Sequence, residues 1–158
     1  MLDTTTILII DAHPSVRNAL RALIETESDI VVVGDGHDFE SAVKMAHTLQ
    51  PDVIILDMMS ASKDGIGMVR AVRRSSPKSQ IIILTDHDYS NRVVDVFREG
   101  VRGFLLKDPL SADIIAAIRG VLDGKIIIHR EVANAIPGAT ELLFENQPAT
   151  MPELFPFA

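Results

Sequence analysis

The sequence predicts a doubly wound α/β fold from three observations. Short runs rich in Ile, Val and Leu alternate with segments of helical periodicity over roughly the first four-fifths of the 158 residues. These runs are apolar almost throughout, as expected for parallel strands that helices cover on both faces. The composition agrees, because 47% of the residues are hydrophobic and only 4% are aromatic, which suits an aliphatic core. Strict alternation implies a parallel sheet with right-handed crossovers, written (βα)5.

Five segments have the pattern of strands, and a helix is expected after each of them. The strands are residues 5–11, 29–34, 52–57, 80–85 and 103–107.

The helices have start signals and apolar faces. Pro14 suits the first turn of a helix, and Asp38 can cap the second helix. The spacing of Phe39 and Leu49 predicts that both face inward in the second helix. Leu122 completes the apolar stripe of the fifth helix in the same way.

One domain is expected over residues 1–125, followed by residues 126–158 as a C-terminal extension and a linker or mobile tail. The segment from 125 to 136 either extends the last helix or forms a short extra strand and helix. Beyond it, prolines interrupt any helix and Lys and Arg are absent. These features favour a tail over a second core.

The charge balance and the absence of cysteine narrow the function classes. The net charge of −7 argues against a free-standing nucleic-acid-binding protein, so we expect no direct DNA binding by this chain alone. With no cysteine, the sequence has no disulfide scaffold and no thiol nucleophile. No apolar run reaches bilayer length, which predicts a cytoplasmic protein without a membrane segment.

Polar residues end four of the five predicted strands. In a doubly wound sheet, ligands bind outside the carboxyl ends of the strands, where the strand order reverses. Asp11, Asp57, Thr85 and Lys107 stand at those ends. They are the parts that phosphoryl transfer needs: a carboxylate nucleophile in Asp57, a magnesium ligand in Asp11, and a hydroxyl and an ammonium group for the phosphate oxygens.

Three linked motifs, "PDVIILD…DG", "IIILT" and "GFLLKD", resemble the receiver domain of bacterial response regulators in order and spacing. The resemblance implies that Asp57 is the phosphoacceptor and that the backbone carbonyl of Met59 joins the magnesium site. It also implies that Thr85 is the switch hydroxyl, Lys107 the phosphate-binding lysine and Phe104 the aromatic residue that moves with Thr85.

The segments "DAHPSVRNALRALIE", "GVRGFLLKD" and "REVANAI" look like the LuxR/NarL-type branch of this family. The resemblance implies a flavodoxin-like fold with strand order 2-1-3-4-5, whose helix 4, strand 5 and helix 5 form the face that switches. It implies a sensor histidine kinase as the phosphoryl donor, a homodimer, and a DNA-binding output domain beyond residue 158 that controls transcription.

The sequence departs from the family pattern at the metal site. Ala12 stands where a second acid usually follows Asp11, so weakened magnesium binding is expected. Asp86, after the switch threonine, would either replace the missing carboxylate or repel phosphate. Two readings therefore stay open: a phosphorylated receiver with a weak metal site, and a phosphorylation-independent module for dimerisation or partner binding.

Two other classes that use the same fold features fit less well. A haloacid-dehalogenase-type phosphatase needs a general acid two residues after its nucleophile, and that position is Met59. A flavodoxin-like cofactor binder needs a phosphate-cradling loop after the first strand, where "DAHPS" stands instead. The chain is therefore expected not to be an enzyme. His13 is interpreted as part of the helix entry, without metal spacing to the other histidines.

Overall fold

The computed structural model describes residues 3–58, 65–85, 93–107, 113–129, 133 and 152–155, and for residues 93, 94, 113 and 152–155 it describes the backbone only. The strands are β1 (Thr5–Ile10), β2 (Ile30–Gly36), β3 (Val53–Leu56), β4 (Gln80–Thr85), β5 (Gly103–Leu106), β6 (Ile126–His129) and β7 (Pro152–Phe155). The helices are α1 (Pro14–Ile24), α2 (Phe39–Leu49), α3 (Gly65–Ser75), α4 (Val93–Arg98) and α5 (Asp113–Leu122).

The strand order is β2-β1-β3-β4-β5-β6-β7, which confirms the predicted order 2-1-3-4-5 and adds two strands after it. The order reverses between β1 and β3, as a doubly wound sheet requires. The chain divides into two compact units, residues 1–81 and 82–158, which are described in turn.

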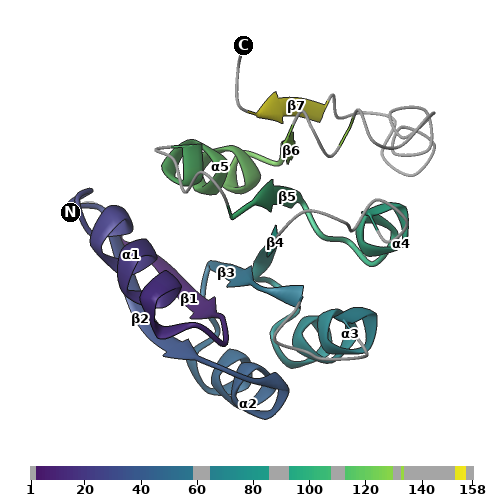
Figure 1. Cartoon of the computed structure of the whole chain (residues 1–158), viewed down its shortest axis with the longest axis horizontal. Helices are drawn as coiled ribbons and strands as arrows, with labels where there is room; N and C mark the ends of the chain where they lie inside the picture. Colours follow the sequence, from purple (N-terminus) through teal and green to yellow (C-terminus); the bar gives the residue numbers. More distant parts are fainter. Residues whose placement is uncertain are drawn as a thin grey trace. The chain divides into compact units, whose positions relative to one another are not determined.

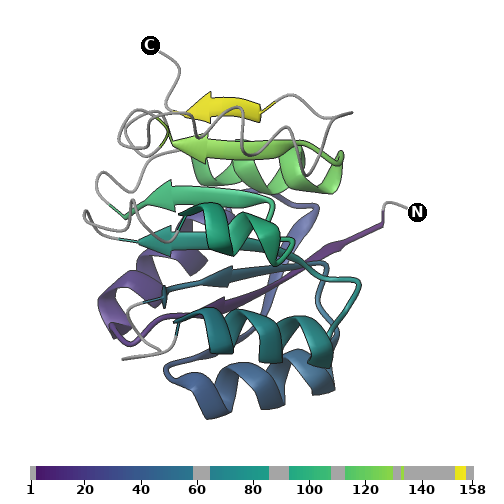
Figure 2. The ribbon, with the colours of Figure 1, turned by 90° about the vertical axis from the view of Figure 1, so that its right-hand side faces the viewer.

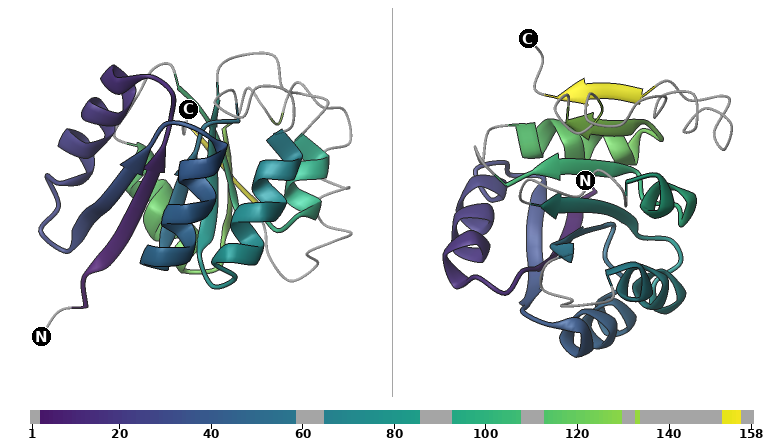
Figure 3. Two further views of the ribbon diagram at one scale, coloured as in Figure 1. Left: turned by 90° about the horizontal axis from the view of Figure 1, so that it is seen from below. Right: turned by 45° about the vertical axis from the view of Figure 1, so that its right-hand side comes forward.

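The first unit is built around β1, which pairs in parallel with β2 and with β3. The four residues from Ile7 to Ile10 and the four residues of β3 are at most 1% exposed, which explains why both strands are apolar throughout. Helix α1 lies on one side of these strands, and α2 and α3 lie on the other (Figures 1 and 3). Both faces of the strands are therefore covered, as predicted.

Helix α1 begins at Pro14, as expected, with His13 as its N-cap. The backbone carbonyl of His13 accepts hydrogen bonds from the amides of Val16 and Arg17, but its side chain makes no capping bond. The helix buries Leu20 and Ile24 against the strands. The imidazole of His13 is thus available for other contacts.

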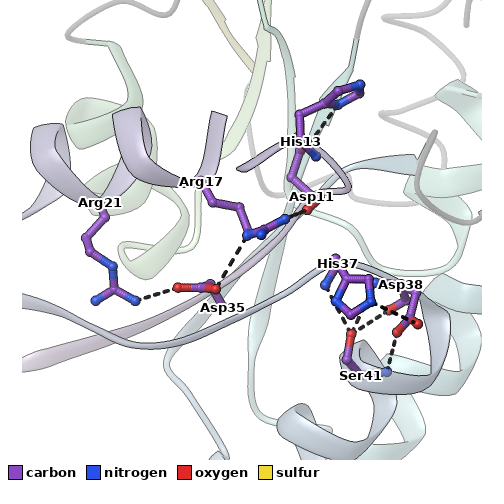
Figure 4. A network of polar contacts seen from close by, with 8 residues as sticks. All are labelled: Asp11, His13, Arg17, Arg21, Asp35, His37, Asp38 and Ser41. Carbon is purple, nitrogen blue, oxygen red and sulfur yellow. Dashed lines mark hydrogen bonds and ion pairs between the residues drawn. The ribbon is translucent and has the colours of Figure 1, made fainter. Parts of the chain in front are cut away.

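Helix α2 has the predicted cap, because Asp38 accepts a hydrogen bond of 2.8 Å from the amide of Ser41 and the two form a capping box (Figure 4). Hydrogen bonds from the side chain and the backbone of Ser41 lower the pKa of Asp38. The cap therefore stabilises the folded state at pH values above the pKa that Asp38 has in the unfolded chain. This stabilisation is lost as the pH falls through the lower pKa of Asp38 in the folded state.

The predicted inward faces of α2 and α5 are wrong at their ends. Phe39 and Leu49 are each 37% exposed, and Leu122 is 41% exposed. All three are the first or last residues of their helices. In α2 the buried side consists of Ala42 and Ala46, whose small side chains suit the close approach of α2 to α3.

In the second unit, β5 pairs in parallel with β4 and β6, and β6 pairs in parallel with β7. Figure 2 shows β5, β6 and β7 running in the same direction. Helix α5 lies on one side of β4, β5 and β6 and α4 on the other (Figure 1). None of the helices in the described part of the chain is long and apolar enough to cross a membrane.

Strand β6 follows the predicted domain boundary at residue 125 and is nevertheless part of the core. Ile126, Ile127 and Ile128 are at most 1% exposed. A Cβ at Gly120 of α5 would lie only 2.7 Å from Cδ1 of Ile127, so the helix packs directly on this strand. Of the two alternatives for this segment, residues 126–129 form the extra strand. Residues 130–132 and 134–136, on which the predicted helix falls, and most of the predicted tail lie outside the described residues.

Because Ile127 is fully buried against α5, we predict that Ile127→Ala lowers the free energy of unfolding by about 2–5 kcal/mol. Leu122→Ala is the matched control, and it should change this free energy by about 0.5 kcal/mol or less because Leu122 is exposed. Urea denaturation measures both. Equal effects of the two substitutions would mean that β6 contributes nothing to the core.

Candidate functional site

The carboxyl ends of β1 and β3 bring the two predicted acids to the same edge. Ile10 pairs with Leu56, so Asp11 and Asp57 follow paired residues on neighbouring parallel strands. The amide of Asp57 donates a 2.9 Å hydrogen bond to the carbonyl of Ile10, which fixes this alignment. Both side chains are 1% exposed. This is the point at which the strand order reverses, where the fold is expected to bind its ligand.

Asp11 is held from two sides. Its Oδ1 accepts a hydrogen bond of 2.8 Å from the amide of His13 and lies 3.1 Å from Nδ1 of the same residue. The guanidinium of Arg17 donates to the backbone carbonyl of Asp11 (Figure 4). The short connection from β1 to α1 is therefore fixed around the carboxylate.

An ion-pair network extends from this connection along α1. Arg17 Nε lies 3.4 Å from Oδ1 of Asp35, and Arg21 donates a 2.7 Å hydrogen bond to Oδ2 of the same carboxylate (Figure 4). This hydrogen bond raises the pKa of Arg21 further. Because Asp35 is at the end of β2, the network ties α1 to the edge strand beside the site.

One ligand atom from each of Asp11, His13 and Asp57 lies within 4.8 Å of the other two. Two carboxylates and an imidazole are donors that divalent metal ions accept, so these residues fit a cation site. Ala12 is exposed and supplies no side-chain donor. Met59 and Asp86, named above as a carbonyl ligand and a candidate replacement acid, lie outside the described residues.

In the second unit, Thr85 and Lys107 form a polar pair at the ends of β4 and β5. Thr85 pairs with Leu106, and the amide of Lys107 donates a 2.7 Å hydrogen bond to the carbonyl of Thr85. The side chain of Lys107 is buried, with the residue 8% exposed. Thr85 Oγ1 is also buried and has no hydrogen-bond partner among the described residues. A buried hydroxyl in this state costs free energy unless a ligand satisfies it.

Phe104 of β5 is fully buried. Its ring centroid lies 6.4 Å from that of Phe97 in α4, with the planes tilted by 34°. The predicted switch aromatic therefore contacts α4 within the second unit. This contact would have to change if the ring moved.

The comparisons with known proteins agree with the predicted family. A family model for the response regulator receiver domain matches residues 7–119. The chain belongs to the response regulator receiver domain family. The receiver is 32% identical over 126 residues to the response regulator protein VraR of Staphylococcus saprophyticus, and 34% identical over 130 residues to the transcriptional regulatory protein LiaR of Bacillus subtilis. These matches cover 80% and 82% of this chain, but only 60% and 62% of those proteins.

Solved structures also resemble the receiver. A two-component response regulator of the LuxR family from Aurantimonas has a TM-score of 0.77 at 28% identity, covering 85% of this chain and 96% of that one. The signal receiver domain of NarL from Mycobacterium tuberculosis has a TM-score of 0.70 at 26% identity, covering 77% and 98%. The receiver thus has the flavodoxin-like fold and is of the LuxR/NarL type, as its motifs predicted.

Reasoning from the sequence missed the contact between His13 and Asp11. The prediction that His13 forms the helix entry is confirmed, because His13 is the N-cap of α1. Its ring, however, turns back to Asp11 instead of capping the helix. The sequence contained a sign of this contact, because a histidine two residues after an acid at the end of a strand can contact that acid in a tight turn.

Thr85→Val should stabilise the resting receiver by about 1–3 kcal/mol, because valine has the shape of threonine without the buried hydroxyl. Thr6→Val is the matched control, because Thr6 Oγ1 lies 3.1 Å from Oδ2 of Asp52 in a hydrogen bond that the change removes. It should destabilise by about 1 kcal/mol. Urea denaturation compares them, and destabilisation by Thr85→Val as well would show that its hydroxyl is already bonded.

Proposed function

We propose that the receiver accepts a phosphoryl group on Asp57 from a sensor histidine kinase. The observation that carries this proposal is the pair of buried carboxylates on neighbouring strands, at the point where the strand order reverses. One of them would be the nucleophile, with its carboxylate oxygen attacking phosphorus while the donor histidine leaves. The phosphate-independent alternative is not favoured, since the named relatives are response regulators.

The other predicted residues have distinct roles in this proposal. Asp11 and Asp57 would hold a divalent cation, which neutralises charge on the phosphoryl oxygens when it is bound. Lys107 would contribute a positive charge to the phosphoryl group, and the Thr85 hydroxyl would donate a hydrogen bond to it. The hydrogen bond from Thr85 to the phosphoryl group would give the buried hydroxyl a partner.

We propose that the bound phosphoryl group then shifts the face formed by α4, β5 and α5. A bond from Thr85 to the phosphoryl group would draw in the end of β4, and Phe104 would leave its present contact with Phe97. Two packings of one aromatic ring make a two-state element that a local charge can bias.

The output is proposed to be transcription control through a homodimer and a DNA-binding domain outside residues 1–158. The chain spans about 60% of the relatives' length, which leaves room for such a domain in proteins of that kind. One solved relative, 26% identical, is described as two RcsB dimers bound to two parallel DNAs. The receiver itself would act as a regulatory domain and not as an enzyme.

Asp57→Asn should abolish labelling by a small acyl phosphate donor, because an amide cannot form the acyl phosphate. Intact-mass spectrometry measures the added phosphoryl group. Asp52→Asn is the matched control: Asp52 precedes the opposite end of β3, is exposed, and contacts Thr6. Labelling of Asp57→Asn at the natural rate would contradict the proposal.

Ala12→Asp should tighten magnesium binding by more than tenfold, or about 1.4 kcal/mol, because it restores the carboxylate that the family pattern has after Asp11. Isothermal titration measures the affinity. Ala12→Asn is the control, since it adds similar volume without charge. If both variants bind magnesium as the natural protein does, the exposed position of Ala12 does not contribute to the cation site.

A further inference from the structure

His13 adds a nitrogen donor to a site that would otherwise offer only oxygen. Its Nδ1 lies 3.1 Å from Oδ1 of Asp11, and its ligand atom belongs to the same group within 4.8 Å as that of Asp57. The side chain is 61% exposed, whereas that of Asp11 is 1% exposed. The imidazole therefore stands at the mouth of the site, with the two carboxylates behind it.

The spacing suits two ligands of one ion. Metal–nitrogen and metal–oxygen bonds of about 2.1 Å put neighbouring ligand atoms about 3.0 Å apart at right angles and about 3.4 Å apart in a tetrahedron. The 3.1 Å between His13 Nδ1 and Asp11 Oδ1 lies within this range. The third ligand atom, from Asp57, lies within 4.8 Å of the other two, so a small rotation of side chains would bring all three to one ion.

The backbone also holds His13 in this position. Its amide donates to Asp11 Oδ1, its carbonyl accepts from the first turn of α1, and the guanidinium of Arg17 donates to the Asp11 carbonyl. The imidazole thus starts from a fixed turn. The His13 side chain makes no capping hydrogen bond to α1, so metal binding would break none.

The chemistry of the donor set changes the preferred ion. Magnesium takes oxygen ligands almost exclusively and is held by carboxylates, of which this site has lost one at Ala12. Imidazole nitrogen favours divalent transition ions such as zinc, which accept a mixture of nitrogen and carboxylate oxygen. The site lacks a carboxylate at residue 12 and has an imidazole nitrogen at residue 13. This difference should shift its selectivity from magnesium toward divalent transition ions.

We propose that Nδ1 of His13 is a third protein ligand of the cation that Asp11 and Asp57 hold, and that the site selects a nitrogen-accepting divalent transition ion over magnesium. The proposal builds on the cation site of the proposed function. It does not require phosphorylation, so metal binding by the unphosphorylated receiver tests it directly.

Nitrogen NMR of the whole chain, labelled with 15N-histidine, identifies the ligand atom. On titration with zinc chloride, Nδ1 of His13 should move to the frequency of a metal-bound nitrogen, and magnesium chloride should leave it in place. His37, which is exposed and lies 3.5 Å from the Asp38 carboxylate, is the internal control and should not move. Saturable zinc binding that leaves His13 Nδ1 unmoved would overturn the proposal.

A substitution separates ligation from positioning. His13→Asn keeps a residue type that suits the N-cap, and the side-chain amide N–H of Asn can still donate to Asp11. The nitrogen of that side-chain amide, however, does not bind zinc. It should weaken zinc binding about tenfold or more and change magnesium binding less than about threefold, while His37→Asn changes neither. Unchanged zinc affinity in His13→Asn would mean that His13 only orients Asp11.

Phosphorylation keeps the two proposals apart. The natural chain tests the proposed function, because it should be labelled by the small acyl phosphate donor at high magnesium concentration whatever the zinc affinity of His13→Asn. Labelling with unchanged zinc affinity would refute the role of His13 and leave the proposed function standing. Loss of zinc affinity in a protein that no donor labels would refute the proposed function and leave the third ligand standing.

Discussion

The burial of two carboxylates side by side is the constraint on which this receiver depends. Asp11 and Asp57 follow paired residues of β1 and β3, and each is 1% exposed. Two like charges at this depth raise the free energy of the folded state unless cations or hydrogen-bond donors compensate them. The amide and ring of His13 meet this need for Asp11 in part. A divalent cation would compensate the two carboxylates further, so the same feature that costs stability suits the edge to binding a cation.

The second unit carries a similar compromise. The hydroxyl of Thr85 is buried without a partner among the described residues, and the ammonium-bearing Lys107 is buried beside it in the β4–β5 pairing. A core optimised for stability would place apolar residues at such positions, as it does from Ile81 to Leu84 of β4. A buried hydroxyl without a partner among the described residues, like that of Thr85, is typical of functional sites. The contact of Phe104 with Phe97 shows how β5 and α4 could carry a change at these positions to the surface.

The fold followed from the sequence because its strands are buried on both faces. Continuous apolar runs such as Ile7 to Ile10 have one plausible environment, and the acids that end them were therefore located correctly. Helix ends were less predictable: Phe39 and Leu49 are exposed, because periodicity assigns a residue to one side of a helix and says nothing of what covers that side at the helix ends. The role of His13 was missed for a related reason. Periodicity places residues on elements, whereas the turn between β1 and α1 is set by hydrogen bonds among Asp11, His13 and Arg17.

The central claim is that the Asp11–Asp57 edge holds a cation and a phosphoryl group together. A crystal structure of the receiver soaked with beryllofluoride, which mimics a phosphoryl group, and a divalent cation tests it most directly. The account predicts beryllofluoride on a carboxylate oxygen of Asp57 and a cation coordinated by the carboxylates of Asp11 and Asp57. Beryllofluoride bound elsewhere, or a well-ordered edge without either group at saturating concentrations, would contradict it.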